Sequence, residues 1–155
     1  MTRRGFTLIE LLLVIGIIAI LAAVVIVAIN PTKQLGDARN AQRRSDVNTI
    51  LNAVYQYAID NQGNLPAGVP TGTAKEVCQT DVVNAGSVCG STYVELRTLT
   101  GSYVVKMPKD PQRPVYSAVT RTNTGTNYFI VQAANGRITV TAPGAEQGAT
   151  ITVTR

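Results

Sequence analysis

A run of 19 residues without a charged or polar side chain, from Leu11 to Ile29, constrains this chain more than any other feature. Ten of these residues are valine or isoleucine, which a helix in water does not favour. In lipid that disadvantage is small, because an unsatisfied backbone group costs more than a restricted rotamer. A helix from Phe6 to Ile29 would be about 36 Å long, enough to cross a hydrocarbon core of roughly 30 Å. The run therefore predicts a membrane helix or a helix buried in an apolar assembly, and the two are compatible.

Glu10 lies at the edge of this run, where a carboxylate is expensive to desolvate. One interpretation is that Glu10 stays in the headgroup layer or complements the N-terminus of the helix. Another is that Glu10 needs a cation once the helix is buried. Cleavage after Gly5 would supply one, because the new amino group of Phe6 would lie about one helical turn from Glu10. This pair would form within one chain or between neighbouring chains.

The chain resembles type IV prepilins and type II secretion pseudopilins over residues 1–30, which contain the segment RRGFTLIE and the apolar run. The resemblance implies that a membrane peptidase cuts after Gly5 and methylates the new N-terminal amine of Phe6. It also implies that Glu10 neutralises the N-terminus of a neighbouring subunit during filament assembly. Many members of the family have a proline inside the apolar helix, whereas the first proline here is Pro31.

The partners and location of the protein follow from the same resemblance. It implies a homo-oligomeric filament, a prepilin peptidase and methyltransferase, an inner-membrane assembly platform and membrane lipid. The precursor would cross the cytoplasmic membrane once, and the filament would be periplasmic or extracellular. We expect no cofactor and no direct binding of nucleic acid. The segment PKDP at residues 108–111 resembles a passage of pseudopilins, whereas the missing acidic C-terminal loop favours a pilin. We predict a structural subunit of a type IV pilus-like filament, with a pseudopilin of a type II secretion or DNA-uptake system as the alternative.

Two other classes of protein remain open on the sequence alone. One is a secreted protein released by a signal peptide cut near Ala28, although the apolar run exceeds the about 7–15 residues usual there. The other is a membrane-tethered enzyme or binding domain. The chain contains no histidine, so no Ser–His–acid or Cys–His arrangement can be built. We identify no catalytic residue and predict that the protein is not an enzyme.

The rest of the chain predicts an α+β fold, in which the second half of a long N-terminal helix packs on a C-terminal antiparallel sheet, as in pilins. Asn30 and Pro31 predict a break, and Gly63 a helix C-cap. Between them, one apolar stripe recurs at helical spacing: Val47, Ile50, Leu51, Val54 and Ala58. The predicted parts are a leader at 1–5, an apolar helix at 6–30 and a head domain at 31–155. The head divides into an amphipathic helix at 31–62, a loop region at 63–112 and a β-meander at 113–155.

Three arginines are predicted to cluster on the exposed side of the second helical half: Arg39, Arg43 and Arg44. They are candidates for contact with anionic lipid, DNA or an acidic patch of a neighbouring subunit. A simpler interpretation is a solvated face whose charge is offset by Asp37 and Asp46. We favour the solvated face or the subunit contact, because no aromatic residues interleave with the arginines as a surface for single strands requires. The formal net charge of +5 is a mild excess and does not argue for nucleic acid.

Cys78 and Cys89 are the two cysteines of the chain. A disulfide between them is permitted outside the cytoplasm, and two free thiols are the alternative in a reducing compartment. We favour the disulfide, and the leader motif agrees in placing the head outside. Basic residues on both sides of the apolar helix leave the positive-inside rule ambiguous. Some pseudopilins bind calcium in an acidic C-terminal loop. We predict no metal site here, because Glu146 is the one acid after Asp110.

A hairpin at Asn135-Gly136 is the clearest β signal. A two-residue turn there would place three apolar pairs on one face: Ala133 with Ile138, Val131 with Val140, and Phe129 with Ala142. The predicted strands are Val115–Arg121, Tyr128–Ala134 and Thr150–Thr154, with turns at residues 123–125 and 142–144. For residues 93–99 we predict a short helix, with a strand as the alternative.

Overall fold

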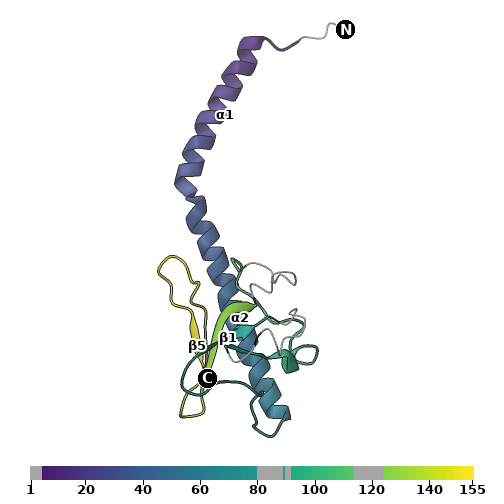
Figure 1. The fold of residues 1–155 in the computed structure, drawn as a ribbon. Helices are drawn as coiled ribbons and strands as arrows, with labels where there is room; N and C mark the ends of the chain where they lie inside the picture. Colours follow the sequence, from purple (N-terminus) through teal and green to yellow (C-terminus); the bar gives the residue numbers. More distant parts are fainter. Residues whose placement is uncertain (1–4, 80–88, 90–91, 114–123) are drawn as a thin grey trace. The chain divides into compact units, whose positions relative to one another are not determined.

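The computed structural model of the chain describes residues 5–79, 89, 92–113 and 124–155 (Figure 1). It contains two compact units, Met1–Gly36 and Asp37–Arg155. The predicted strand Val115–Arg121, and Asn123 of the predicted turn after it, lie outside the described residues.

Helix α1 comprises Leu8–Ile29 and confirms the helix predicted for the apolar run (Figure 1). Thr7 is its N-cap, and Thr7 and Glu10 form a capping box, in which each side chain accepts the other's backbone N–H. None of the side chains of α1 is buried. The mean hydropathy of α1 is 3.4, and by length and composition the helix suffices to cross a membrane. A signal sequence near an N-terminus meets the same criteria.

The break predicted at Asn30 is confirmed. Asn30 has a φ of 42°, in the left-handed region that asparagine tolerates better than most residues, and it separates α1 from helix α2. Pro31 begins α2, where its missing N–H leaves no helical hydrogen bond unmade. The side-chain oxygen of Asn30 accepts hydrogen bonds from the Thr32 hydroxyl at 2.8 Å and from the Lys33 N–H at 3.3 Å. Asn30 thus ends one helix and caps the next.

Helix α2 comprises Pro31–Asp60 and carries the predicted apolar stripe into the core of the second unit. The described members of the stripe are buried: Val47, Ile50, Leu51 and Val54 are 0% exposed and Ala58 is 8% exposed. After the helix, the Gly63 N–H donates to the Ala58 carbonyl oxygen at 2.7 Å, and Gly63 has a φ of 89°. The predicted glycine cap is therefore present.

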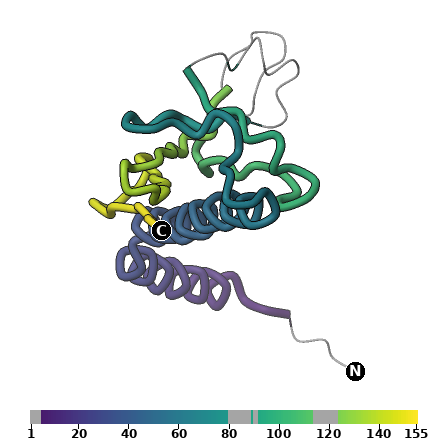
Figure 2. The backbone as a smooth tube through the Cα atoms, turned by 90° about the horizontal axis from the view of Figure 1, so that it is seen from below, coloured from purple at the N-terminus to yellow at the C-terminus, as the bar shows by residue number. Residues whose placement is uncertain are grey.

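One sheet has the strand order β2-β1-β3-β4-β5 in the described part of the chain. The strands are β1 (Lys75–Cys78), β2 (Tyr93–Val94), β3 (Gly125–Gln132), β4 (Ile138–Thr141) and β5 (Thr152–Thr154). The pairs β1–β3, β3–β4 and β4–β5 are antiparallel. Strand β2 pairs with β1 in parallel, so the sheet is mixed. The predicted α+β class is confirmed, and the sheet lies on one side of α2 (Figure 2).

Strands β1 and β2 lie where we predicted a loop and a short helix. Residues 93–94 form β2, and the single helical turn that follows, a 3₁₀ helix, covers Arg97–Leu99. The predicted helix is therefore wrong for its first residues. Val77 and Val94 are opposite each other in the parallel pair, and both are buried. Such short strands carry too few residues to show a period-2 pattern.

The predicted register of the β3–β4 hairpin is wrong by one residue. Ala133 was expected opposite Ile138, but its N–H donates to the Arg137 carbonyl oxygen at 2.8 Å. The Gly136 N–H donates to the Ala133 carbonyl oxygen at 2.9 Å, so the loop contains three residues instead of two. Gly136 has a φ of 82° and supplies the left-handed residue that such a loop requires.

This shift exchanges the two faces of β3, because side chains alternate along a strand. Ile130 is opposite Val140, and both are 0% exposed. Tyr128 is buried with them, whereas Phe129 and Val131 lie on the other face and are half-buried. The inner face of the sheet packs with the α2 stripe in one hydrophobic cluster, as predicted.

Cys78 and Cys89 are joined by a disulfide, so the structure contains the favoured of the two alternatives. Both residues are 2% exposed. Cys78 ends β1, and the Cys89 carbonyl oxygen accepts a hydrogen bond from the Tyr93 N–H at the start of β2. The bridge therefore links the end of β1 to a residue that is hydrogen-bonded to the start of β2.

Candidate functional site

The residues predicted for processing and assembly lie at the start of α1. Gly5 and Phe6 precede the helix and are exposed, Phe6 to 83%. The Thr7 N–H and hydroxyl both donate to Glu10 Oε2, at 2.8 Å and 2.7 Å. The same four residues line one hollow of the surface. The residues predicted for cleavage, methylation and assembly therefore lie together in an exposed segment of the described structure.

The surface of α1 is apolar on every side. The exposed fraction of its large apolar side chains ranges from 50% at Val14 to 83% at Val27. Single exposed apolar residues are ordinary, but a contiguous surface of this size marks contact with lipid or protein. This surface cannot remain in water, so α1 needs a bilayer or other subunits around it.

Arg43 contradicts the prediction of an exposed arginine cluster. Arg44 is exposed and the Arg39 side chain is 31% exposed, but Arg43 is 0% exposed. Arg43 precedes Val47 and Ile50 of the stripe by four and seven residues, which places all three on one helix face. Sequence alone favoured solvent for Arg43, since a charged side chain is rarely buried unless it is paired.

The Arg43 guanidinium is paired on every side. It binds Asp110 through two hydrogen bonds, Nε to Oδ2 at 2.7 Å and Nη2 to Oδ1 at 3.0 Å. Its Nη1 donates to Glu146 at 2.9 Å and to the Asn40 side chain at 3.1 Å, and Nη2 donates to Gln112 at 2.7 Å. Only arginine presents donors in this planar, forked arrangement. Arg43 therefore joins α2 to the 108–112 turn and to the loop between β4 and β5.

The β4–β5 loop is fastened to α2 at Glu146. The Asn40 amide nitrogen donates to the Glu146 carbonyl oxygen at 2.8 Å, and the Glu146 N–H returns a bond to Asn40 at 2.9 Å. Arg39 adds two bonds to the Glu146 carboxylate, at 2.7 Å and 2.6 Å. Gly144 packs so closely that a Cβ there would lie 2.6 Å from Asp110 Oδ2. The loop and the turn are thus held to the same part of the helix.

These contacts shift the ionisation of the cluster. The hydrogen bonds to Asp110 raise the pKa of Arg43. Burial alone would raise the pKa of Asp110, but the hydrogen bonds from Arg43 and from the Gln112 N–H hold it below its ordinary value. Hydrogen bonds from Arg39 and then Arg43 lower the pKa of Glu146 to about 2. The charges of the cluster therefore persist through the physiological range.

Asp46 is a second buried acid on α2, and it has no cation bound to it in the described structure. The Tyr128 hydroxyl donates to Asp46 at 2.6 Å and the Gln42 amide at 2.7 Å. Burial raises the pKa of Asp46 above its ordinary value, against the effect of these two hydrogen bonds, and the nearby Asp110 carboxylate raises it further. Burial and Asp46 also raise the pKa of Tyr128. The hydrogen bond from Tyr128 thus ties β3 to Asp46, but the ionised form of Asp46 is unfavourable because it is buried.

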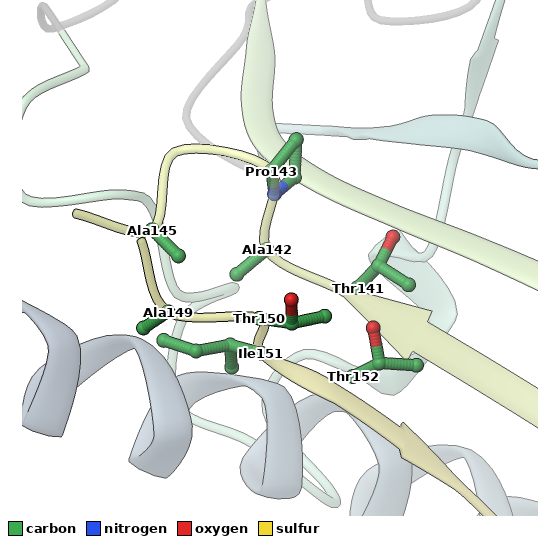
Figure 3. A pocket seen from close by; sticks show the side chains of 8 residues that line it. All are labelled: Thr141, Ala142, Pro143, Ala145, Ala149, Thr150, Ile151 and Thr152. Atoms are coloured by element: carbon green, nitrogen blue, oxygen red, sulfur yellow. The ribbon is translucent and has the colours of Figure 1, made fainter. Parts of the chain in front are cut away.

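A cavity of about 200 Å³ lies inside the β4–β5 loop (Figure 3). In the figure, Thr141 and Thr152 stand side by side on adjacent strands, next to the small side chains of the loop. Its lining contains no charged residue and consists of Thr141, Ala142, Pro143, Ala145, Ala149, Thr150, Ile151 and Thr152. This cavity offers neither an acid–base pair nor a nucleophile with a base, so it has no catalytic arrangement.

Sequence reasoning missed the cluster around Arg43 but noted two of its members for other reasons. Asp110 belongs to the PKDP segment, and Glu146 was considered as a calcium ligand. Both acids instead bind the internal guanidinium of Arg43. The available signal was an arginine four residues before an apolar stripe, together with two acids in segments rich in proline and glycine. Spacing does not reveal such a contact, because Asp110 and Glu146 are 67 and 103 residues away from Arg43 in the sequence.

An apolar helix with an acid in its N-terminal capping box, followed by a helix packed on a sheet, defines a pilin-like α+β protein. A family profile described as the prokaryotic N-terminal methylation motif matches residues 1–26. The chain is also similar to the type II secretion system core protein G of Vibrio cholerae serotype O1. The two are 29% identical over 147 residues, which cover 94% of this chain and 90% of that protein. No solved structure matches the chain.

These findings confirm the resemblance to type IV pilins and pseudopilins that the N-terminal residues carry. They support a pilin-type structural subunit and a membrane-anchored precursor. The proteins of this kind are structural, not catalytic.

Replacing Arg43 with alanine should destabilise the second unit. Asp110 would remain buried without its cation, and breaking a buried pair in this way costs about 3–5 kcal/mol. Arg43→Lys should recover part of the loss, because lysine keeps the charge but not the forked donors. Chemical unfolding of the full chain in detergent, followed by near-ultraviolet circular dichroism of the tyrosines, measures the change.

Arg44→Ala is the matched control for Arg43→Ala, since the neighbouring arginine is exposed and should change stability by less than about 0.5 kcal/mol. Equal effects of the two alanine variants would show that the buried cluster contributes nothing special to stability.

Replacing Asp46 with asparagine should stabilise the protein at neutral pH. Because the folded pKa of Asp46 is raised, its neutral form stabilises the fold at low pH, and this stability is lost as pH rises through the folded pKa. Asparagine stays neutral and can still accept the Tyr128 hydroxyl. Unfolding should therefore be harder in Asp46→Asn than in the wild type at pH 7, with the difference shrinking towards about pH 3.

The exposed Asp37 on the same helix provides the comparison: Asp37→Asn removes a surface charge and should change stability by less than about 0.5 kcal/mol. If Asp46→Asn is less stable than the wild type at pH 7, the Asp46 carboxylate is a favourable part of the core.

Proposed function

We propose that this chain is the precursor of a structural subunit that polymerises into a filament through α1. The methylation motif at residues 1–26, placed at the front of a helix without a single buried side chain, is the observation that carries the proposal. A subunit of this kind is first held in the bilayer by α1 and later packs α1 among copies of itself. In both states the apolar surface is covered.

Processing would occur at the exposed start of the helix. A prepilin peptidase cuts after Gly5, which removes residues 1–5, and a methyl group is added to the amine of Phe6. Both positions precede α1, so the enzyme need not unwind the helix to reach the bond. The head lies on the far side of the membrane from the leader, where oxidation of Cys78 and Cys89 is permitted.

Assembly would use the carboxylate of Glu10. Both Thr7 donors bind Oε2, and Oε1 has no hydrogen bond within the described residues. A cation can therefore bind Oε1 while the capping box stays intact. The Phe6 amine of a neighbouring subunit is the cation that cleavage supplies, and the pair would set the axial position of one subunit against the next. Membrane lipid and an assembly platform of the inner membrane are the remaining partners.

Of the filament types, a type II secretion pseudopilus is supported by the similarity to core protein G over 90% of that protein's length. The alternatives are a surface pilus and a DNA-uptake filament. All three require the same processing and the same stem.

Mass spectrometry of the intact protein from its native cell should find an N-terminus at Phe6 with the added mass of one methyl group. In the family that this chain resembles, a glycine precedes the cleaved bond, so Gly5→Leu should leave residues 1–5 attached. A wild-type chain that keeps its first five residues would disprove the proposed processing.

Glu10→Val should leave membrane insertion and folding intact but reduce filament yield. An unpaired buried amine in the assembled stem costs about 3–5 kcal/mol, enough to abolish most assembly. Glu95→Val, which removes an acid of the second unit, is the control and should assemble normally. Filaments sheared from cells and quantified by immunoblot provide the measurement, and a normal yield from Glu10→Val would refute this role.

A further inference from the structure

The surroundings of the Arg43 guanidinium are made entirely of oxygen atoms, as the surroundings of a hard metal ion are. Among the described residues, five oxygens accept its hydrogen bonds at distances of 2.7 to 3.1 Å: Asp110 Oδ1 and Oδ2, Glu146 Oε2, Asn40 Oδ1 and Gln112 Oε1. We call these atoms the oxygen cage. Carboxylate and amide oxygens are the ligands that Ca²⁺ takes in proteins, in flexible geometry. The chain itself places a cation in this cage, from helix α2.

The oxygen cage requires a positive charge. Asp110 is buried, and a buried carboxylate without a cation is strongly unfavourable. Arg43 supplies that charge and shares the Glu146 carboxylate with Arg39. The cage is nevertheless reachable from solvent, because Glu146 is half-buried and Gln112 is exposed. An ion could therefore enter the cage without unfolding of the second unit.

The acids of the cage are also held by hydrogen bonds that do not involve Arg43. The Gln112 N–H donates to Asp110 Oδ1 at 2.9 Å, within the 108–112 turn. The backbone of Glu146 forms two hydrogen bonds with the Asn40 side chain, at 2.8 Å and 2.9 Å, which fasten the β4–β5 loop to α2. Both carboxylates therefore have supports that remain when the guanidinium is removed, so the cage should persist in a folded Arg43 variant.

We propose that the guanidinium of Arg43 takes the place of a divalent cation in the second unit, and that the same oxygens bind Ca²⁺ once the guanidinium is removed. In the wild type the cation is part of the chain, so neither a chelator nor dilution can remove it. The anchoring of the 108–112 turn and the β4–β5 loop is then independent of the calcium concentration around the protein. The inference rests on contacts within the second unit and not on the proposed filament function.

Thermal unfolding of the full chain in detergent, in a calcium chelator or in millimolar calcium chloride, tests both parts of the proposal. The wild type should melt at the same temperature in the two solutions. The melting temperature of Arg43→Ala should be at least about 5 °C higher in calcium chloride, because an ion that binds only the folded state stabilises it by mass action. Stabilisation of the wild type by calcium, or no calcium effect on a folded Arg43→Ala, would overturn the proposal.

Three control variants locate the calcium effect. Arg43→Lys keeps a positive charge in the cage and should gain nothing from calcium. Arg44→Ala removes the neighbouring, exposed arginine and should also gain nothing. Combining Arg43→Ala with Asp110→Asn removes the buried carboxylate of the cage and should abolish the gain. If either of the two single controls gains as much as Arg43→Ala, or the double variant keeps the gain, calcium acts elsewhere and the proposal fails.

A second variant covers the case in which Arg43→Ala does not fold in the chelator. Arg43→Gln leaves the cage without a cation but keeps a long polar side chain that can still donate to Asp110. Titration of calcium chloride into this variant, followed by calorimetry, should show one ion bound per chain, and none in the wild type. Addition of calcium chloride should also restore the near-ultraviolet circular dichroism of an unfolded Arg43→Ala. The proposal is overturned if calcium neither binds Arg43→Gln nor restores Arg43→Ala.

Discussion

The apolar surface of α1 is the constraint on which the rest of this protein depends. Not one of its side chains is buried within the chain, so the second unit must be stable on its own residues. That unit builds a separate core from one face of α2 and one face of a sheet. The first unit therefore requires an apolar environment, whereas the second unit folds in water around its own core.

Within the second unit, the buried guanidinium of Arg43 connects segments of the fold, as apolar packing does in the rest of the core. Arg43 binds two segments that belong to no helix or strand, the 108–112 turn and the β4–β5 loop. A buried ion pair adds little net stability, but it restricts the positions of the two groups, because leaving one partner unpaired is costly. Asp46 and Tyr128 add a second polar contact between helix and sheet. Helix α2 is thereby held against the sheet by directional hydrogen bonds as well as by apolar packing.

This arrangement explains why three arginines so close in sequence differ in role. Arg43 lies on the side of the apolar stripe, Arg44 is one helical step of about 100° away, and Arg39 lies near the border between the two sides. Their chemistry is the same, and the helix face on which each arginine lies decides whether it is buried or exposed. The buried Arg43 binds Asp110 and Glu146, whereas Arg44 lies in solvent.

The predictions from sequence succeeded where the signal was local and long. The apolar run, the break at Asn30, the α2 stripe and the glycine cap were all readable, because each depends on residues within a few turns of one another. The hairpin was located correctly, but its register was wrong by one residue. The predicted register places three apolar pairs opposite each other, and the observed one places Ile130 opposite Val140. The choice depends on the loop geometry at Gly136 and on which face of β3 fits the helix. Strands β1 and β2 were missed because each is too short to show a period.

The sequence by itself determined that this chain has a processing motif, an apolar helix that cannot remain in water, and a head of class α+β. These follow from the order of residues along one helix, where neighbours in sequence are neighbours in space. Only the tertiary structure decided that Arg43 is buried and that Asp110 and Glu146 are its partners. The reason is physical: whether a charge is paired depends on residues brought together from distant parts of the chain, and no local pattern records that distance.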